Sequence, residues 1–573
     1  MIDIWTPADP WPDNGRELLI VGPPGTGKTR NVLDAYVWPA LREGQTVLAT
    51  SYTRAAAEEL RKRTSAELGR PPGTYREELS TMHSEASRRC RALKFKLGQE
   101  RDGAPVPDED ESEVREVGIA ARIDEESTRS GIAAWDRTRN LYPEDIGLPI
   151  EDRLRRVGLY GSQLDDAVVA VERDMHRRYR DGVLVYPDFT TLLEQALTRG
   201  DDRRLDLLVI DEAQDCTPLQ WALIDRWART SERVLLVGDP DQSIYAWAGA
   251  DGQRLLTWIR AGRCTRRLAQ SYRVPVAAHR LARQVIALVT DREDAPYHPK
   301  ADRDTGIPVE GSVRETYGED AWEAVAAAQD DGRAVFVLAR TRGGCATAVS
   351  DLERVGIPYI GERGGSVLGL PTAPSRALSV ALAMQEVAAG ESVAPDGARR
   401  LVAGLSTKGL ETMRRGAKGD LTEAVKSKRS RIPLDILADA GLPVDELAAL
   451  WRVLSGQTFH PDPAREAARC LIASVVSADD VTLVARWLSL YGERLVPVAG
   501  LVRVTTAHGS KGREAPLVLL DARSRIRGRQ TQAEADEDRR VLYVAVTRTE
   551  QDLVVLRSYG SEDWLSMHGV GVK

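Results

Sequence analysis

A glycine-rich run near the start of the chain has the residue types and spacing that bind phosphate. In "GPPGTGKTR", Gly22, Gly27, Lys28 and Thr29 match the pattern G-x-x-x-x-G-K-[ST], between a short apolar run and a helical pattern. Backbone N–H groups of such a loop surround phosphates at a helix N-terminus, the lysine adds positive charge, and the hydroxyl is a ligand for Mg²⁺. We therefore expect a nucleoside triphosphate and Mg²⁺ to bind here. The loop residues expected to contact the nucleotide are Gly22, Pro23, Pro24, Gly25, Thr26, Gly27, Lys28 and Thr29.

A second run, "LDLLVIDEAQD", supplies the carboxylates that hydrolysis of a metal-bound triphosphate requires. Asp211 and Glu212 directly follow the apolar run 207–210, which predicts a buried parallel strand. Asp211 is then placed to hold Mg²⁺ through water, with Thr29 as a second metal ligand, and Glu212 to orient or deprotonate an attacking water. The alternative, acids that cap the next helix, suits Asp215 better than these two residues.

A third run, "GDPDQSIYAWAGA" at 238–250, brings an amide close to two aromatic rings. Gln242 can contact a phosphate, and Tyr245 and Trp247 follow shortly after it. Core packing is the ordinary role of a tryptophan. We predict that role for tryptophans without such neighbours, namely Trp135, Trp221, Trp227, Trp258 and Trp451.

The spacing of these runs predicts a divided α/β domain. About 180 residues separate Lys28 from Asp211, more than one α/β nucleotide-binding domain needs between its phosphate loop and its metal strand. Segment 84–186 is the predicted insert, because it reads mainly as polar helices and loops. A chain of 573 residues also exceeds a single core, so we expect more than one domain.

Composition limits the class of protein. Hydrophobic residues make up 42% of the chain, apolar runs are only strand-sized, and the N-terminus lacks a signal-peptide pattern, so we expect a cytoplasmic protein without a membrane partner. Five cysteines without a CxxC pair argue against a zinc ribbon, an iron–sulfur cluster or a disulfide framework. The formal net charge of -7 gives no overall attraction to nucleic acid, although a local basic groove is compatible with it.

In chain order, these runs and several others resemble the motifs of the UvrD/Rep/PcrA-type helicases of superfamily 1 (SF1A). The matching blocks are "GPPGTGKTR", "SYTRAAAEEL", "TMHS", "YPDFTTLL", "LLVIDEAQD", "VGDPDQSIYAWAGA", "LAQSYR", "VRVTTAHGSKGREAPLVLL" and "RRVLYVAVTRT". The resemblance implies an α/β fold with two RecA-like parallel-sheet P-loop domains, each interrupted by a mostly helical insert. The implied segments are 1–83 with 187–275 and 276–370 with 501–573 for the RecA-like domains, and 84–186 and 371–500 for the inserts.

The resemblance also implies roles around the nucleotide. Arg273 in "QSYR" and Arg548 in "YVAVTRT" correspond to arginine fingers that neutralise transition-state charge. Arg30 and Tyr272 would sandwich the adenine, since a guanidinium and a phenol ring both stack on a base. Glu514 would lie near the ribose and triphosphate, with a helix-start carboxylate as its alternative. The implied catalytic set is Lys28, Glu212, Gln242, Arg273 and Arg548.

For DNA, the resemblance gives the aromatic rings a second role. Gln242 would report on the γ-phosphate, and Trp247 would stack on a base of single-stranded DNA, a contact of ~1–3 kcal/mol that tolerates any base. Packing under the motif and DNA contact both suit Tyr245. Further implied contacts to phosphate and sugar come from Tyr52, Thr53, Arg54, Thr81, His83, Thr506 and His508. For the two histidines, a structural role remains an alternative.

The chain departs from the family pattern at several points. "PADPWPDNGRELLIV" lacks the Gln of "LNxxQ" that reads the adenine edge, which leaves open the use of other nucleotides. Ala248 stands where the family has an arginine after the stacking ring, and "YTRAAA" replaces "FTNKAA". The sequence ends soon after Arg548, so we expect no nuclease domain.

These observations favour one function and leave alternatives open. The leading hypothesis is an ATP-dependent translocase on single-stranded DNA that unwinds tailed duplex DNA 3′ to 5′, with ATP and Mg²⁺. A translocase that displaces bound proteins with weak unwinding, and a nucleotide-switched DNA clamp, remain the alternatives. The sequence does not choose between repair, replication, recombination, phage and plasmid roles, nor does it identify partner proteins or the oligomeric state.

Overall fold

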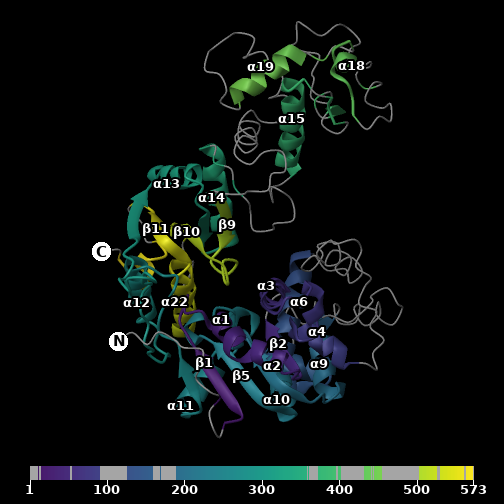
Figure 1. Ribbon diagram of the computed structural model, residues 1–573, viewed down its shortest axis with the longest axis vertical. Helices are drawn as coiled ribbons and strands as arrows, with labels where there is room; N and C mark the ends of the chain where they lie inside the picture. The colour runs from purple at the N-terminus through teal and green to yellow at the C-terminus, as the bar shows by residue number, and fades with distance from the viewer. Residues whose placement is uncertain are drawn as a thin grey trace. The chain divides into compact units, whose positions relative to one another are not determined.

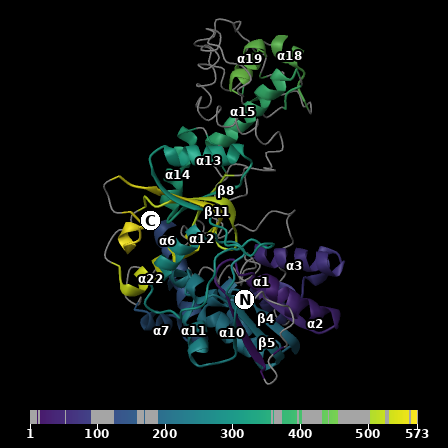
Figure 2. The ribbon, with the colours of Figure 1, turned by 60° about the vertical axis from the view of Figure 1, so that its left-hand side comes forward.

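The computed structural model describes two compact units of the chain (Figures 1 and 2). Unit 1 comprises Met1–Arg273, Ile286–Pro308 and Gln530–Tyr543, and unit 2 comprises Val274–Val285, Val309–Arg529 and Val544–Lys573. The residues described within these units are 11, 15–51, 54–90, 125–158, 168–169, 189–355, 357, 359, 372–390, 392–394, 398–399, 401, 422, 431–439, 442, 444–454, 502–524, 530–559 and 563–571.

Unit 1 is built on a six-stranded parallel sheet with the order β3-β2-β4-β5-β1-β6. The strands are β1 (Glu17–Val21), β2 (Val47–Ser51), β3 (Leu79–Thr81), β4 (Leu205–Ile210), β5 (Ser231–Gly238) and β6 (Thr265–Arg267). Alternate residues of a strand point to opposite faces, so the two faces of β1 contribute to separate cores. Leu18 and Ile20 join one core, and Leu19 and Val21 join the other.

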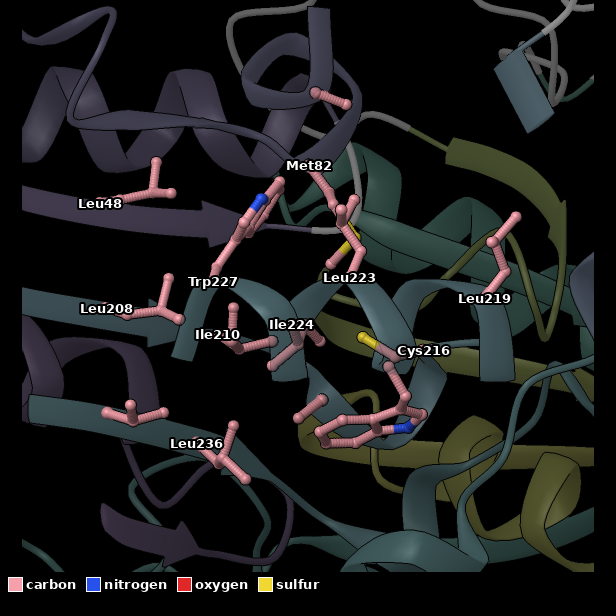
Figure 3. Packing of buried hydrophobic residues seen from close by; sticks show 14 of the residues in the cluster. Leu48, Met82, Leu208, Ile210, Cys216, Leu219, Leu223, Ile224, Trp227 and Leu236 are labelled. Atoms are coloured by element: carbon pink, nitrogen blue, oxygen red, sulfur yellow. The ribbon is translucent and has the colours of Figure 1, made fainter. Parts of the chain in front are cut away.

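Unit 1 also contains helices, several of which pack against those two cores. They are α1 (Lys28–Val32), a π-helical turn (Leu33–Val37), α2 (Trp38–Arg42), α3 (Arg54–Leu68), α4 (Met82–Arg89), α6 (Glu125–Leu141), α7 (Ile150–Arg156), α9 (Phe189–Arg199), α10 (Pro218–Arg229), α11 (Gln253–Arg260) and the first part of α22 (Gln532–Val546). Figure 3 shows Trp227 of α10 packed among aliphatic side chains of the sheet. Helix α10 begins with a capping box between Thr217 and Gln220 and with Pro218 in its first turn.

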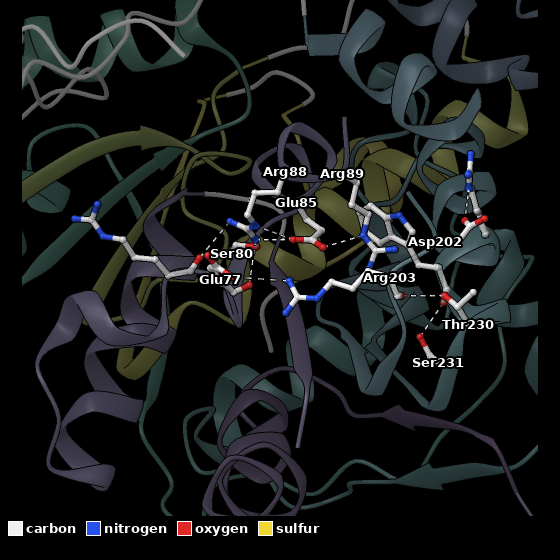
Figure 4. A network of polar contacts seen from close by, with 12 residues as sticks. Glu77, Ser80, Glu85, Arg88, Arg89, Asp202, Arg203, Thr230 and Ser231 are labelled. Carbon is white, nitrogen blue, oxygen red and sulfur yellow. Dashed lines mark hydrogen bonds and ion pairs between the residues drawn. The ribbon is translucent and has the colours of Figure 1, made fainter. Parts of the chain in front are cut away.

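The described segment between β3 and β4 is helical, but its two ends belong to the sheet's core. Met82 and Ala86 of α4 and Ala196 of α9 pack in the same cluster as the strands. On α4, buried Glu85 accepts hydrogen bonds from Arg88 and Arg89, each at 2.8 Å (Figure 4). The core of unit 1 thus extends beyond residue 83, and the predicted segment boundaries at 83 and 187 stay predictions.

Unit 2 contains a five-stranded parallel sheet with the order β7-β11-β10-β8-β9. The strands are β7 (Ser312–Tyr317), β8 (Val335–Ala339), β9 (Val502–Thr506), β10 (Ala515–Asp521) and β11 (Thr549–Arg557). The described helices before β9 are α12 (Val276–Ile286), α13 (Asp320–Asp330), α14 (Arg342–Arg354), α15 (Thr372–Ala388), α18 (Leu434–Asp439) and α19 (Val444–Leu454). The last four lie between β8 and β9 in the chain, so the described part of this long connection is mainly helical.

The predicted α/β fold class with two parallel sheets is confirmed. Two segments of the expected second domain, Ile286–Pro308 and Gln530–Tyr543, belong to unit 1, and the expected segment bounds stay predictions. Among the described helices, none has the length and apolar content needed to cross a membrane.

Candidate functional site

The predicted phosphate loop connects β1 to α1 in unit 1, and two of its glycines adopt a left-handed backbone. Gly25 has φ of 76° and Gly27, which caps α1, has φ of 72°. A Cβ atom on Gly25 would also lie 2.6 Å from both the Ser271 Oγ and the Arg273 Cβ. Glycine is therefore required where the loop packs against the "QSYR" segment.

Two side chains of the loop donate hydrogen bonds to carbonyl oxygens of the loop itself. Lys28 Nζ donates a hydrogen bond to the carbonyl oxygen of Gly22 at 2.6 Å, and Thr26 Oγ1 donates to that of Pro23 at 2.8 Å. The carbonyl oxygen of Pro24 accepts hydrogen bonds at 3.1 Å from Ser271 Oγ and Tyr297 Oη. The lysine charge is held at the loop, where a triphosphate would need it.

Two oxygen ligands suited to Mg²⁺ lie side by side next to the loop. Thr29 Oγ1 donates to Asp211 Oδ2 at 3.1 Å, and Asp211 Oδ1 accepts from the backbone N–H of Glu212 at 3.0 Å. Burial raises the pKa of Asp211 to about 7, with a further rise from the Glu212 charge, while Lys28 lowers it. A desolvated carboxylate next to a hydroxyl is a donor set that fits a hard divalent cation.

Glu212 has the only left-handed backbone among the described non-glycine residues, with φ of 55° and ψ of 41°. Its side chain is held by Gln214, whose Nε2 donates to Glu212 Oε2 at 2.5 Å. Gln214 Oε1 accepts from the backbone N–H of Asp239 at 3.0 Å. A Cβ atom on Gly238 would lie 2.5 Å from this Oε1, so the fully buried amide fits only against glycine. Gln214 is not among the residues predicted from the sequence, although it stands within the "DEAQD" run.

Gln242 lies on the 3-10 turn Pro240–Gln242 that follows β5, and its Nε2 donates to Asp239 Oδ2 at 2.6 Å. Burial raises the pKa of Asp239 to about 6, and the Lys28 charge opposes this rise. The neighbouring Asp241 forms an ion pair with Arg292 at 2.8 Å, both side chains being largely buried. Arg292 was also missed, because nothing in its own run "TDRED" indicates a distant partner.

Trp247 differs from the tryptophans predicted to be core residues. All five of those are buried, which confirms that prediction, whereas Trp247 is 61% exposed on the 3-10 turn Ala246–Ala248. The Tyr245 and Trp247 ring centroids are 6.3 Å apart at an interplanar angle of 58°. Core packing therefore does not explain Trp247, and its exposure is compatible with the predicted stacking role.

The two residues expected to sandwich the adenine lie near the phosphate loop. Tyr272 is 44% exposed, its backbone N–H donates to the Gly25 carbonyl oxygen at 2.8 Å, and its ring borders Gly27. Arg30 is exposed and forms an ion pair with Asp34 at 2.7 Å. The stacking roles of Arg30 and Tyr272 stay predictions.

The expected DNA contacts of unit 1 are placed in part. Thr81 ends β3 and caps α4 by accepting a hydrogen bond from the Ser84 N–H at 3.2 Å. His83, in the first turn of α4, meets the exposed Phe189 ring edge-on, with centroids 5.3 Å apart. Tyr52, Thr53 and the side chain of Arg54 lie outside the described residues.

The remaining predicted residues lie in unit 2. Arg548 follows α22 and is 1% exposed, with its Nε donating to the Val544 carbonyl oxygen at 2.9 Å. Glu514 is exposed just before β10. Thr506 Oγ1 accepts from the backbone N–H of Gly509 at 3.1 Å in the turn after β9, and His508 is partly buried in the same turn. The structure thus gathers Lys28, Thr29, Asp211, Glu212, Gln242, Tyr272 and Arg273 in unit 1 and Thr506, His508, Glu514 and Arg548 in unit 2.

Comparison with known proteins identifies related chains. The model of the UvrD/REP helicase N-terminal domain matches residues 10–260, and that of the UvrD-like helicase C-terminal domain matches residues 501–556. "DNA helicase II" of Escherichia coli (strain K12) is 27% identical over 270 residues, which cover 45% of this chain and 36% of that protein. "ATP-dependent DNA helicase UvrD2" of Mycobacterium tuberculosis (strain H37Rv) is 26% identical over 298 residues, covering 48% and 42%.

A third relative gives the same result. "ATP-dependent DNA helicase PcrA" of Staphylococcus epidermidis (strain RP62A) is 28% identical over 255 residues, which cover 42% of this chain and 34% of that protein. The chain thus spans well under half the length of these relatives. The two domain models nevertheless match, in order, the parts of the chain that carry the phosphate loop and the Arg548 motif, and together they take in more than half of it. The chain belongs to the UvrD/Rep/PcrA-type helicases of superfamily 1.

Proposed function

We propose that this chain is an ATP-dependent translocase on single-stranded DNA and a 3′-to-5′ DNA helicase that acts in repair, replication or recombination. One observation carries the proposal. The exposed ring of Trp247 lies on the chain turn that directly follows Gln242, and Gln242 is bonded to Asp239, which Gln214 connects to Glu212. A ring suited to stacking on bases is thereby connected, through a short chain segment and hydrogen bonds, to a site suited to hydrolysing a triphosphate.

In the proposed hydrolysis, the phosphate loop and Lys28 bind the β and γ oxygens of ATP. Thr29 and Asp211 would hold Mg²⁺, which offsets the charge of the phosphates when it is bound. Glu212, whose side chain is held by the hydrogen bond from Gln214, would accept a proton from the attacking water.

The two arginines have different starting positions in the proposed mechanism. Arg273 lies in unit 1 next to Gly25, close to the phosphate loop in the same unit. Arg548 is buried in unit 2 on the carbonyl oxygens of Val544 and Arg513. Because Arg548 is 1% exposed, its contact with a γ-phosphate would require a conformational step, which would couple hydrolysis to movement.

The first experiment measures ATP hydrolysis by the full chain with and without single-stranded DNA, for wild type, Glu212→Gln and Trp247→Ala. We expect strong stimulation by DNA in wild type, and a loss of about 10²- to 10⁴-fold in Glu212→Gln because the general base is removed. Trp247→Ala should need more DNA for half-maximal stimulation, since it loses a stacking contact of ~1–3 kcal/mol. A wild-type rate that DNA does not change would contradict a DNA-coupled motor and favour the nucleotide-switched clamp.

Strand displacement then separates the helicase from the protein-displacing translocase. Duplexes with a 3′ or a 5′ single-stranded tail are incubated with the protein and ATP, and a parallel substrate carries a bound protein block on single-stranded DNA. Unwinding of the 3′-tailed duplex alone is the expected result. Release of the block without unwinding would support displacement of proteins instead, and unwinding of only the 5′-tailed duplex would overturn the proposed direction.

A further inference from the structure

Helix α22 contributes a carboxylate to the turn that carries Trp247. The backbone N–H of Trp247 donates a hydrogen bond to Glu537 Oε1 at 3.3 Å. The turn Ala246–Ala248 buries none of its own residues and ends in a left-handed Gly249 with φ of 92°. The Glu537 carboxylate thus connects the backbone of this exposed turn to a neighbouring helix.

The part of α22 that carries Glu537 is itself firmly attached within unit 1. Asp536 Oδ2 accepts hydrogen bonds from the backbone N–H of Thr290 at 3.1 Å and from its hydroxyl at 2.5 Å. On the next turn of the helix, Arg539 and Arg540 donate to the carbonyl oxygens of Leu288 and Asp291 at 2.9 Å and 2.7 Å. Glu537 therefore projects from a fixed support.

The same support reaches the turn of Gln242. Arg292 directly follows the segment held by α22, and its guanidinium binds the carboxylate of Asp241 at 2.8 Å. The turn Ala246–Ala248 thus contacts α22 directly, and the turn Pro240–Gln242 is connected to α22 through Arg292. Ala248, which follows Trp247, has no polar side-chain group that could connect this turn to another element. Helix α22 makes such a connection through Glu537, and the helix ends two residues before Arg548.

We propose that Glu537 is a positioning residue, which holds Trp247 in the orientation in which its ring stacks on a base of single-stranded DNA. This inference rests on the proposed function, since it assigns the orientation of the same DNA contact. Glu537 itself touches neither base nor phosphate in this proposal. Glu537 affects DNA binding by orienting the Trp247 ring through the backbone of that residue. The effect is therefore lost when the ring is removed.

The test compares Glu537→Ala with Glu537→Gln, because the glutamine retains an oxygen that accepts the Trp247 N–H. The measurement is the concentration of an oligothymidylate that gives half-maximal stimulation of ATP hydrolysis. We expect Glu537→Ala to raise this concentration about three- to tenfold, the factor that one ordinary hydrogen bond corresponds to. We expect Glu537→Gln to stay near wild type, and amide hydrogen exchange at Trp247 to accelerate only in the alanine variant.

A double-mutant cycle distinguishes positioning from a general structural role. In a Trp247→Ala background, Glu537→Ala should cause no further change in half-maximal DNA, because the ring it orients is gone. Glu59→Ala, which removes an exposed carboxylate paired with Arg63 on α3, is the matched control and should resemble wild type. An equal loss with and without the ring, or unchanged DNA dependence in Glu537→Ala, would overturn the inference and leave the proposed function intact. A wild type that DNA does not stimulate would overturn both.

Discussion

At the scale of single residues, the candidate catalytic carboxylate depends on a neighbour that carries no charge. Gln214 donates to Glu212 and accepts from the backbone of Asp239, so its amide fixes two loops relative to each other within unit 1. An amide can serve both loops because it has a donor and an acceptor, whereas a carboxylate has acceptors only. The orientation of Glu212 therefore follows from the identity of this buried side chain.

Gln214→Glu should slow ATP hydrolysis while nucleotide binding persists. The variant keeps the shape of the side chain, but it loses the donor to Glu212 and places a second carboxylate there. We expect kcat to fall about 10- to 100-fold, the range found when a partner that orients an active group is lost, with the KM for ATP nearly unchanged. Gln45→Glu, at a half-buried site outside the phosphate loop whose side chain can still accept from Arg233, is the control. A large rise in KM with unchanged kcat would contradict the positioning role.

At the scale of elements, helix α4 is attached to unit 1 by a buried charge cluster (Figure 4). Glu85 is 1% exposed and pairs with Arg88 and Arg89, and the Arg89 guanidinium also lies 4.8 Å from the Trp227 ring centroid. The cluster fixes α4 where the chain leaves the sheet toward α6. Because Arg89 is buried, removal of its carboxylate leaves a positive charge without compensation.

Glu85→Ala should destabilise unit 1 by about 3–5 kcal/mol, the usual cost of removing one partner from a buried ion pair. Chemical unfolding followed by intrinsic fluorescence measures this change, since Trp227 lies in the same core. Glu59→Ala, whose pair with Arg63 is exposed, should change the free energy of unfolding by ~0–1 kcal/mol. Equal stability of the two variants would show that the cluster does not hold α4.

Elements were easier to predict from the sequence than the contacts between them. The apolar run that became β4 is a local signal, and the phosphate loop and the "DEAQD" run each specify their own geometry. By contrast, Arg292 and Glu537 act on partners 51 and 290 residues away in the chain. A single charged residue in a polar run has no periodicity or spacing that reveals such a partner. The burial of Arg548 was not predictable either, since its motif indicates a residue type and not its surroundings.

At the scale of the whole molecule, unit 2 has a cluster of ion pairs at its last described strand, β11. Arg557 of β11 pairs with Glu315 of β7 and with Asp563, which also accepts from the N–H of Ser566 at 3.0 Å. Burial raises the pKa of Asp563, but the hydrogen bonds from Arg557 and Ser566 outweigh this effect and lower the pKa below its usual value. This ion-pair cluster connects β7 and β11 with the segment after β11 that contains Asp563.

The lowered pKa of Asp563 makes the stability of unit 2 depend on pH in the acid range. Folding favours the ionised form, so the contribution is complete above the unfolded pKa of about 3.9 and is lost as the pH falls through the lower folded value. Asp563→Asn should lower the free energy of unfolding near pH 7 by about 1–3 kcal/mol and reduce its fall between pH 5 and pH 2. Urea unfolding across this pH range measures both effects. Parallel pH curves for variant and wild type would exclude this role of Asp563.

The interleaved units set the order in which a newly made chain can fold. Unit 1 needs Gln530–Tyr543, and β11, the strand that connects β7 to the other strands of unit 2, starts only at Thr549. A ribosome that adds about 5–20 residues per second takes roughly half a minute to two minutes to reach this point. Through that interval, the sheet of unit 2 waits for β11, while unit 1, whose six strands end at Arg267, waits only for Gln530–Tyr543 with the first part of α22.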